Sequence, residues 1–485
     1  MFKSIKTLIN WISFACILFL STGLSYAQID MTGLNEAEYI YKAAEDSLSH
    51  YFYNETYLRL NYNNIEVGLS FIAELPKYDQ FEAIEDLHPN NIDYRWDDRY
   101  IQLSLTNLRI RAGSFTEFYG AGIVLRSYRD KTYDHDTRLI GLNAQYSTEE
   151  WEFKGLYAGV PNENSPNHND LIGGLDLTRD LLNFGHIGLS LTSQQIRRFD
   201  NRYSTRIVAG SRVEFFTDYF DFYSEYAESK SYRKISGETR GQAIYGLANA
   251  YVNKFTITGG YKKFTRFDDR LNDLPTLNSS EEPLSERLNP GEDEEGLLGQ
   301  VRFNPDFTTE LGATYSEAWN SDFSIRQSDF FVEGRKYYDS FTLGLEYAQL
   351  EMTDKVRQHW QKEITPAVLL DFNLLSLPTH IRTELGYHEK VEGESSRDYF
   401  NPLLQFDLFF NRFSLSLISE FEIEDLNELD ELESWIGIEL TTDILPNTDL
   451  KIFIGEERGG KVCRSGVCYY TTPFKGLRVN LTTRF

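Results

Sequence analysis

The sequence contains few sulfur-containing residues, few basic residues and only one long apolar run. Its 485 residues include 3 Cys and 3 Met, and after residue 20 no apolar stretch reaches the roughly 18 residues that a membrane-spanning helix needs. Only 48 Lys and Arg accompany 74 Asp and Glu, so the formal net charge is −26. These absences exclude a bundle of membrane helices. They also argue against binding of nucleic acid or of an anionic membrane surface, because either would repel the chain.

Aromatic residues, in contrast, are plentiful, with 31 Tyr, 34 Phe and 6 Trp. Charged residues make up 25% of the chain and its mean hydropathy is −0.44, so the chain has enough apolar side chains to fold. This composition is more typical of a β-rich surface protein than of a cytosolic enzyme.

The N-terminus has the layout of a secretory signal peptide. Lys3 and Lys6 precede an apolar run over residues 8–20, and Ser25-Tyr26-Ala27 supplies small residues at the −3 and −1 positions of a cleavage site. The alternative is an uncleaved anchor, but the run is short for a spanning helix. We therefore predict that residues 1–27 are removed and that the protein is exported.

The remaining chain repeats one pattern, in which segments of about ten residues alternate apolar with polar side chains. In the last segment one face carries Leu477, Val479, Leu481 and Phe485, and the other carries Arg478, Asn480, Thr482 and Arg484. Residues 340–348 and 399–410 alternate in the same way. Side chains alternate across a strand, so this pattern predicts antiparallel strands with one apolar and one polar face.

The connections alternate between tight turns and long polar stretches. The tight turns are Asn63-Asn64, Thr106-Asn107, Thr217-Asp218, Asn304-Pro305-Asp306, Asn411-Arg412 and Pro446-Asn447. The long stretches are 76–98, 161–170, 230–239, 266–296, 389–397, 425–432 and 457–473. Short periplasmic turns and long extracellular loops are typical of an outer-membrane barrel, as are aromatic residues near the segment ends.

We therefore predict an all-β, transmembrane, antiparallel up-and-down β-barrel of roughly 22–24 strands in the cell outer membrane, surrounded by its lipid. Phe485, at the tip of the last strand, resembles the terminal signal that the barrel-assembly machinery reads during biogenesis. The predicted division is a signal peptide at 1–27, an N-terminal segment at 28–56 with a strand near 31–41, and the barrel at 57–485.

A barrel of this width leaves an open lumen, since far smaller porins already hold a water-filled channel. Residues 28–56 are too few for a separate plug domain, so closure is expected from inward-folded loops, a flattened cross-section or a partner protein. Lumen-facing charges are expected at Arg109, Arg111, Glu346, Asp407, Arg478 and Arg484. Such mixed charge suits water or charged solutes.

The most distinctive segment covers residues 111–130 and reads RAGSFTEFYGAGIVLRSYRD. Its glycines predict a bulge or the close approach of another backbone, and its charged side chains would be rejected by lipid. We predict that it constricts the lumen, with Arg126 paired to a lumen carboxylate; the alternative is a strand that only bends at its glycines. The residues assigned to this constriction are Gly113, Glu117, Gly120, Gly122, Arg126 and Arg129.

The same segment resembles the signature of a family of uncharacterised Bacteroidota outer-membrane β-barrels, classed only as a domain of unknown function. The resemblance lies in Gly113-Ser-Phe115, in Tyr119-Gly120-Ala-Gly122 with the aliphatic run that follows, and in Arg126-Ser-Tyr128. Residues 459–476, which include Cys463 and Cys468, are similar to the end of that family. The resemblance implies an outer-membrane barrel over the mature chain and assigns no activity.

Cys463 and Cys468 are the two cysteines that remain after removal of the signal peptide. In an exported chain, two cysteines separated by four residues predict a disulfide, and Gly466 allows the turn between them. A metal site is the alternative, but no histidine is nearby in the sequence.

Two other clusters have residue types suited to metal binding or catalysis. The acidic runs at 281–282, 292–295 and 420–433 suit either divalent cations or a solvated loop, and we favour the loop because no calcium-loop spacing is present. In Tyr133-Asp134-His135-Asp136 the histidine has the chemistry of a general base. No nucleophile can be identified with it, so we predict no enzyme, no metal and no cofactor.

Three functions of different classes remain. The first is a porin-like or partner-gated channel for polar solutes. The second is a structural or assembly component of a surface or secretion complex, and the third and most distant is an outer-membrane hydrolase.

Overall fold

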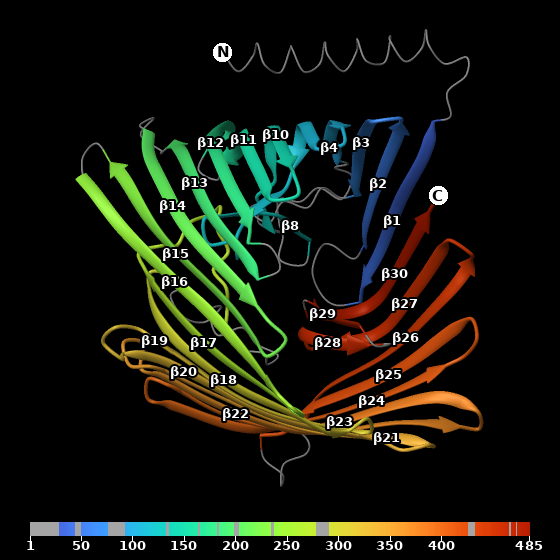
Figure 1. The fold of residues 1–485 in the computed structure, drawn as a ribbon. Helices are drawn as coiled ribbons and strands as arrows, with labels where there is room; N and C mark the ends of the chain where they lie inside the picture. Colours follow the sequence, from blue (N-terminus) through green and yellow to red (C-terminus); the bar gives the residue numbers. More distant parts are fainter. Residues whose placement is uncertain are drawn as a thin grey trace.

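The computed structural model describes residues 29–43, 50–75, 93–131, 135–162, 165–181, 184–197, 203–233, 237–277, 291–424, 432–464, 467–471 and 473–485. Within these ranges the chain is built from β-strands (Figure 1). No helix long and apolar enough to cross a membrane occurs among these residues.

The wall is one antiparallel sheet of 24 strands that closes on itself, because β1 pairs with β2 on one side and with β30 on the other. Its strands are β1 (Asp30–Lys42), β2 (His50–Tyr62), β3 (Ile65–Leu75), β4 (Asp93–Ser104), β5 (Leu108–Phe115), β10 (Leu139–Ser147), β11 (Trp151–Asn162), β12 (Ser165–Asp180), β13 (Gly185–Arg197), β14 (Tyr203–Phe216), β15 (Phe220–Arg233), β16 (Gly237–Val252), β17 (Phe255–Thr265), β18 (Asp293–Asp306), β19 (Thr309–Trp319), β20 (Ile325–Tyr337), β21 (Phe341–Asp354), β22 (His359–Leu374), β23 (Leu377–Glu392), β24 (Ser395–Phe409), β25 (Phe413–Glu422), β26 (Glu433–Leu445), β27 (Thr448–Glu457) and β30 (Phe474–Arg484). The predicted all-β, up-and-down barrel of antiparallel strands is confirmed.

Alternation along most of the wall places apolar side chains on the outer face and polar side chains on the inner face. In β13, Leu189 is 60% exposed and Leu191 45% exposed, whereas the intervening Ser190 is 6% exposed and Thr192 is fully buried. Closure of the sheet leaves no edge strand, so every wall strand is paired on both sides. This is the reverse of a soluble fold, in which apolar side chains point inward.

The two rims of the barrel differ in the length of their connections. At one rim, called here the short-turn rim, successive strands are joined by two to four residues, as at 63–64, 217–219 and 446–447. At the opposite rim, called the long-connection rim, the connections include 76–92, 116–138, 266–292 and 458–473. The alternation read from the sequence is therefore present in the structure.

Several predicted connections are in fact strand. Residues 161–170, 230–239 and 389–397 lie mostly in β11, β12, β15, β16, β23 and β24. The period of two fades there because polar side chains occupy both faces, although the backbone ladder continues. Residues 304–306 belong to β18, whose register shifts between Phe303 and Asp306, and the turn follows at 307–308. A shift of this kind tolerates the missing donor of Pro305.

The wall begins earlier than the predicted boundary at residue 57. β1 occupies the place expected for a strand near 31–41, and β2 begins at His50, so β1 and the start of β2 lie within the region set apart as 28–56. The predicted signal peptide at 1–27 lies outside the part of the chain that the structure describes. Phe485 forms two backbone hydrogen bonds with Gly33, which closes the ladder between β30 and β1 at the short-turn rim. Its role as an assembly signal stays a prediction.

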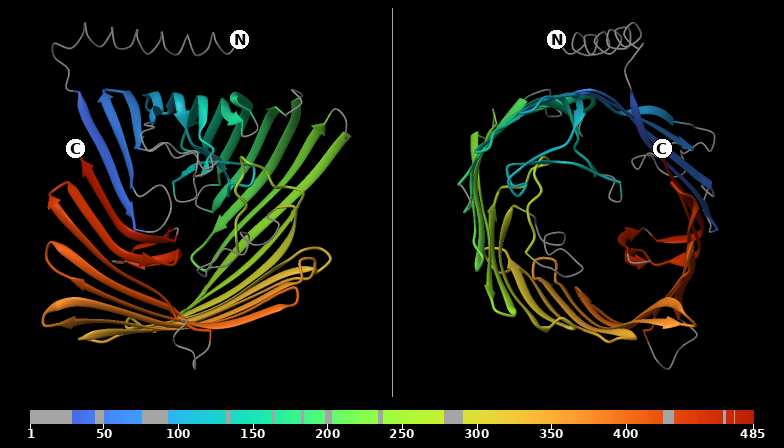
Figure 2. Two further views of the ribbon diagram at one scale, coloured as in Figure 1. Left: turned by 180° about the vertical axis from the view of Figure 1, so that it is seen from behind. Right: turned by 45° about the vertical axis from the view of Figure 1, so that its right-hand side comes forward.

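Three long connections fold into the ring instead of extending away from it. The right-hand view of Figure 2 shows residues 116–131, 135–138, 266–277, 458–464 and 467–471 inside the circle of wall strands. They carry the short strands β6 (Glu117–Tyr119), β7 (Leu125–Ser127), β8 (Arg129–Asp130), β9 (His135–Asp136), β28 (Gly460–Arg464) and β29 (Val467–Thr471). Inward-folded loops, one of the three expected kinds of closure, are present in the structure.

Candidate functional site

The candidate site is the pair of connections that pack against the inner wall. The first insert, residues 116–138, leaves the wall after Phe115 and returns at Leu139, and these two residues are paired directly in the sheet. The second insert, residues 266–292, leaves after Thr265 and returns at the directly paired Asp293; its described residues are 266–277 and 291–292. Each insert is therefore an excursion from one continuous hairpin of the wall.

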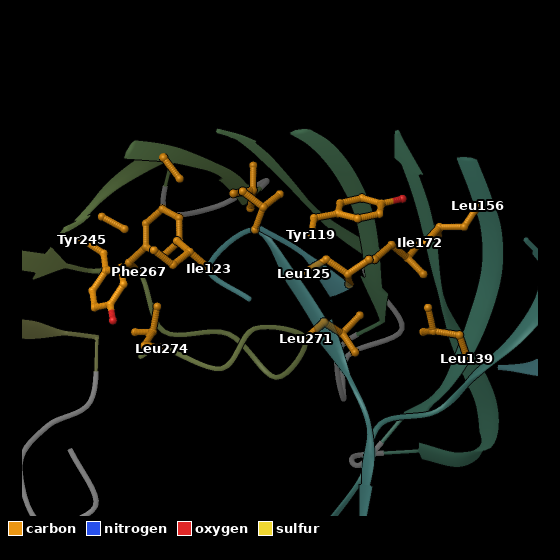
Figure 3. Packing of buried hydrophobic residues seen from close by; sticks show 14 of the residues in the cluster. Tyr119, Ile123, Leu125, Leu139, Leu156, Ile172, Tyr245, Phe267, Leu271 and Leu274 are labelled. Atoms are coloured by element: carbon orange, nitrogen blue, oxygen red, sulfur yellow. The ribbon is translucent and has the colours of Figure 1, made fainter. Parts of the chain in front are cut away.

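An apolar cluster joins both inserts to the wall (Figure 3). From the first insert, Tyr119, Ile123 and Leu125 are fully buried, and from the second insert Phe267 and Leu271 are nearly or fully buried. The wall contributes inward-facing apolar side chains from β10 to β17: Leu139, Leu156, Ala158, Val160, Ile172, Val208, Ala227, Ala243, Tyr245 and Phe264. On this side of the ring the inner face therefore carries an apolar patch, and the inserts cover it.

The two inserts also bind each other through polar contacts. The backbone N–H of Arg126 donates to the carbonyl oxygen of Leu271 at 2.8 Å, and the N–H of Asp273 donates to the carbonyl oxygen of Gly122 at 3.2 Å. The guanidinium of Arg126 lies 2.8 Å from the carboxylate of Asp273. Asp273 is the acidic partner of Arg126, and it comes from the second insert rather than from a wall strand.

A carboxylate from the wall holds the tip of the first insert. Glu225 on β15 is 1% exposed, and its Oε2 accepts the backbone N–H of Ala121 at 2.7 Å and the hydroxyl of Tyr223 at 2.6 Å. Gly120 has a φ of +58°, and a Cβ at this position would overlap the Glu225 carboxylate. The turn therefore needs glycine both for its backbone conformation and for space.

Replacing Gly120 with Val tests this contact, and Gly237→Val is its matched control. Gly237 has a φ of +79° but no atom within 4 Å of an added Cβ. Both variants lose about 1–3 kcal/mol because of the left-handed backbone, and Gly120→Val additionally displaces Glu225. We expect the temperature midpoint for loss of the folded gel band to fall clearly further in Gly120→Val. Equal midpoints would contradict the inference that a side chain at position 120 displaces Glu225.

Gly113 lies in the wall, and the side chain of Glu117 points towards the wall rather than into the open interior. Gly113 lies in β5 with a φ of +118°, and a Cβ there would overlap the carbonyl oxygen of Arg99 on β4. Glu117 is 9% exposed, and its carboxylate accepts the side-chain amide of Asn143 at 2.6 Å. The predicted approach of another backbone is thus met at Gly113, whereas Glu117 anchors the insert to β10.

The second half of the first insert forms an ionic network with β1, β2 and β4. The guanidinium of Arg129 lies 2.9 Å from Glu55 and 2.8 Å from Asp97, and Lys131 lies 2.6 Å from Glu36. Arg138 contacts Asp97, Asp98 and Asp136 at 2.5–2.7 Å. Burial raises the pKa of Asp136, but the hydrogen bonds and the charge of Arg138 outweigh burial and leave this pKa below its ordinary value.

The six charged residues predicted to face the lumen all contact polar or charged side chains. Their partners are Gln145 for Arg109, Gln102 and Glu66 for Arg111, Arg382 for Glu346, Gln405 for Asp407, Glu457 for Arg478 and Asp449 for Arg484. Asp407 is fully buried, whereas the Arg484 side chain is 58% exposed near the short-turn rim.

Sequence reasoning missed Glu225, Asp273 and the wall carboxylates Glu36, Glu55 and Asp97. It also missed the pair formed by Lys262 and Glu294, whose side chains are 0% and 1% exposed. A single acidic residue on the polar face of a strand looks, in the sequence, like every other acidic residue on such a face. One local signal was present: the second insert has a large apolar residue at every third or fourth position, at Phe267, Leu271, Leu274 and Leu277, which a solvated loop does not need.

The weaker candidates have other roles in the structure. Asp136 is bound by Arg138 and the ring of His135 packs on Tyr128, so Asp136 does not orient His135; residues 133 and 134 lie outside the described residues. In the acidic runs, Glu422 pairs with Arg458 at 2.6 Å and Glu294 with Lys262. Among the described residues no group of three or more His, Cys, Asp or Glu side chains is arranged to hold a metal ion.

The two cysteines lie in the third inward connection. Cys463 and Cys468 are directly paired residues of β28 and β29, while their side chains lie outside the described part of the chain. Paired Cα positions in adjacent strands are within the separation that a disulfide spans. The disulfide stays a prediction.

Comparison with known proteins gives one family match. A model described as "Family of unknown function (DUF6029)" matches residues 5–284. No curated protein matches the chain. The fold is similar to the P pilus usher (PapC) translocation pore, with a TM-score of 0.48 and 10% identity, covering 94% of this chain and 99% of that chain.

Two further solved structures are similar at the same level. The siderophore receptor PirA from Pseudomonas aeruginosa has a TM-score of 0.46 and 9% identity, covering 95% of this chain and 80% of that chain. The outer membrane transporter YddB from Escherichia coli has a TM-score of 0.46 and 9% identity, covering 94% and 81%. Likenesses this distant carry no argument about the role of this chain.

Proposed function

The chain belongs to this family of unknown function, and from that premise we propose that it is an outer-membrane channel for polar solutes whose lumen is narrowed by its own inserts. The observation that carries the proposal is the reversed polarity of the wall. Apolar side chains cover the outer face, polar side chains line the inner face outside the apolar patch under the inserts, and the sheet has no edge. This is the arrangement that a bilayer requires.

Aromatic side chains at the short-turn rim support a membrane position. Stacked pairs lie there at Phe255–Phe303, Tyr338–Phe341 and Phe410–Phe413, with ring centroids 4.2–4.4 Å apart. Belts of aromatic side chains mark the level of the lipid headgroups. By this proposal the short turns face the periplasm and the long connections face outside, as the sequence pattern predicts.

The interior supports restricted passage rather than a wide pore. The first and second inserts pack on β10–β17 and on each other, so one side of the ring is filled by protein. The exposed edge of this filling carries Arg126, whose side chain is 48% exposed, and Asp273, whose side chain is 38% exposed. A solute that passes this edge meets charge of both signs, which favours small polar or charged solutes over apolar ones.

The proposal is tested with the mature protein in planar lipid bilayers. We expect it to fractionate with outer membranes, to migrate faster on gels when unheated, and to give a small, stable single-channel conductance. A folded protein that conducts no ions and copurifies with a stoichiometric partner would contradict the channel and favour a structural or assembly component.

A further inference from the structure

The first insert is held by apolar packing up to Leu125 and by polar contacts after it. Five residues between Phe115 and Leu125 belong to the apolar cluster: Phe115, Tyr119, Ile123, Val124 and Leu125. None of the described residues from Arg126 to Arg138 belongs to it, and the cluster resumes at Leu139. The insert therefore has an apolar half followed by a polar half.

The polar half reaches the neighbouring part of the wall, on the other side of β5 from β10. We call residues 128–131 and 135–138 the strap; its two arms pair through the N–H of Thr137, which donates to the carbonyl oxygen of Tyr128 at 2.9 Å. The side chains of Arg129 and Lys131 reach Glu55 on β2, at 2.9 and 2.7 Å. The ionic network joins the strap to β1, β2 and β4, which precede β5 in the ring, whereas the apolar cluster lies on β5 and on the strands from β10 to β17.

Detaching the apolar half from the wall requires more free energy than detaching the polar half. Burial of large apolar side chains such as Ile123 and Leu125 stabilises the apolar half, and NaCl does not screen this gain. The ion pairs of the strap gain less, and dissolved ions compete with them, because Lys131 is 46% exposed and Arg129 20% exposed. Removing the apolar half would also expose the apolar patch on the inner face of the wall to water.

We propose that the strap is a latch, held on β1, β2 and β4 by ion pairs, that releases while the apolar half of the insert stays in place. Glu36, Glu55, Asp97 and Asp98 form the wall side of the latch, and Arg129, Lys131 and Arg138 form the strap side. Arg138 is fixed by the adjoining β10, so Arg129 and Lys131 decide whether the strap is bound. The consequence, a wider passage along β1–β4, rests on the proposed channel function; the latch itself does not.

Hydrogen–deuterium exchange of the mature protein in lipid nanodiscs tests the latch without any measurement of transport. The amide of Thr137 reports on the strap, and the amide of Gly122, which donates to Tyr119 at 3.0 Å, reports on the apolar half. In the Arg129→Gln/Lys131→Gln variant we expect exchange in the strap to rise several-fold and exchange at residues 119–125 to stay unchanged. Raising NaCl should have the same effect on the wild type and little further effect on the variant.

Two other variants keep the test decisive. Glu55→Gln removes the shared carboxylate from the wall side and should also speed exchange in the strap. Lys263→Gln/Arg326→Gln removes two cations that pair with Glu295 and Glu317 elsewhere on the wall, and should change neither half. The latch would be refuted if the two halves exchanged together, or if salt affected the double variant of the strap as much as the wild type.

Discussion

Excising both inserts is expected to raise the single-channel conductance of the barrel several-fold. The inserts occupy the interior of the ring over β10–β17, so their removal widens the water-filled cross-section, on which conductance depends. It also exposes apolar side chains such as Leu156 and Ile172 to water, so we expect a less stable barrel that still closes, because its 24-stranded ladder is untouched.

The pairing of the wall makes this excision clean. Phe115 pairs directly with Leu139, and Thr265 with Asp293, so a two-residue Asn-Gly turn can replace residues 116–138 and another can replace 266–292. The matched control replaces residues 355–358, between the paired Asp354 and His359, with the same turn. It shortens a connection that is not part of either insert and should leave the conductance unchanged.

The single excisions distinguish one plug from two separate loops. Arg126 binds Leu271 and Asp273, and Gly122 accepts a hydrogen bond from Asp273, so each insert supports the other. We therefore expect either single excision to increase current noise and conductance, and the double excision to exceed both. Wild-type conductance in a folded double excision would mean that the inserts do not limit passage, and the proposed constriction would be wrong.

Many wall strands could be predicted because their pattern depends on residues that are close together in the sequence. In residues 474–485 the alternation of Leu477 and Val479 with Arg478 and Asn480 is enough to predict a strand with one apolar face. Tight turns such as 63–64 and 446–447 could be located from Asn and Pro residues alone. The prediction failed at residues 161–170 and 389–397, where polar side chains on both faces hide a ladder that continues.

The site could be predicted only in part, because its contacts join residues distant in the chain. The unusual glycines and charges of residues 113–130 indicate a special segment, and Gly120 and Arg126 do hold special positions. Their partners, Glu225 and Asp273, are more than one hundred residues away, and nothing local separates them from other carboxylates. Which wall strand faces an insert depends on the closure of the whole ring.

Replacing Lys262 with Met is expected to destabilise the barrel strongly. Lys262 on β17 and Glu294 on β18 pair with each other at 0% and 1% exposure, next to the Thr265–Asp293 pair where the second insert leaves the wall. Without Lys262, the Glu294 carboxylate stays buried with no cation beside it. Removing one partner of a buried pair costs about 3–5 kcal/mol.

The double variant Lys262→Met/Glu294→Leu separates the cost of a lone charge from the loss of the pair. Burying two apolar side chains in place of a buried ion pair is often neutral, so the double variant should recover most of the stability lost in Lys262→Met. The measurement is the urea midpoint at which the folded gel band disappears. If single and double variants lost the same stability, the pair itself would stabilise the base of the second insert, and the lone carboxylate would not be the cause. Recovery would show instead that the wall tolerates an apolar contact at this position, as the neighbouring Phe264 and Leu277 of the cluster already suggest.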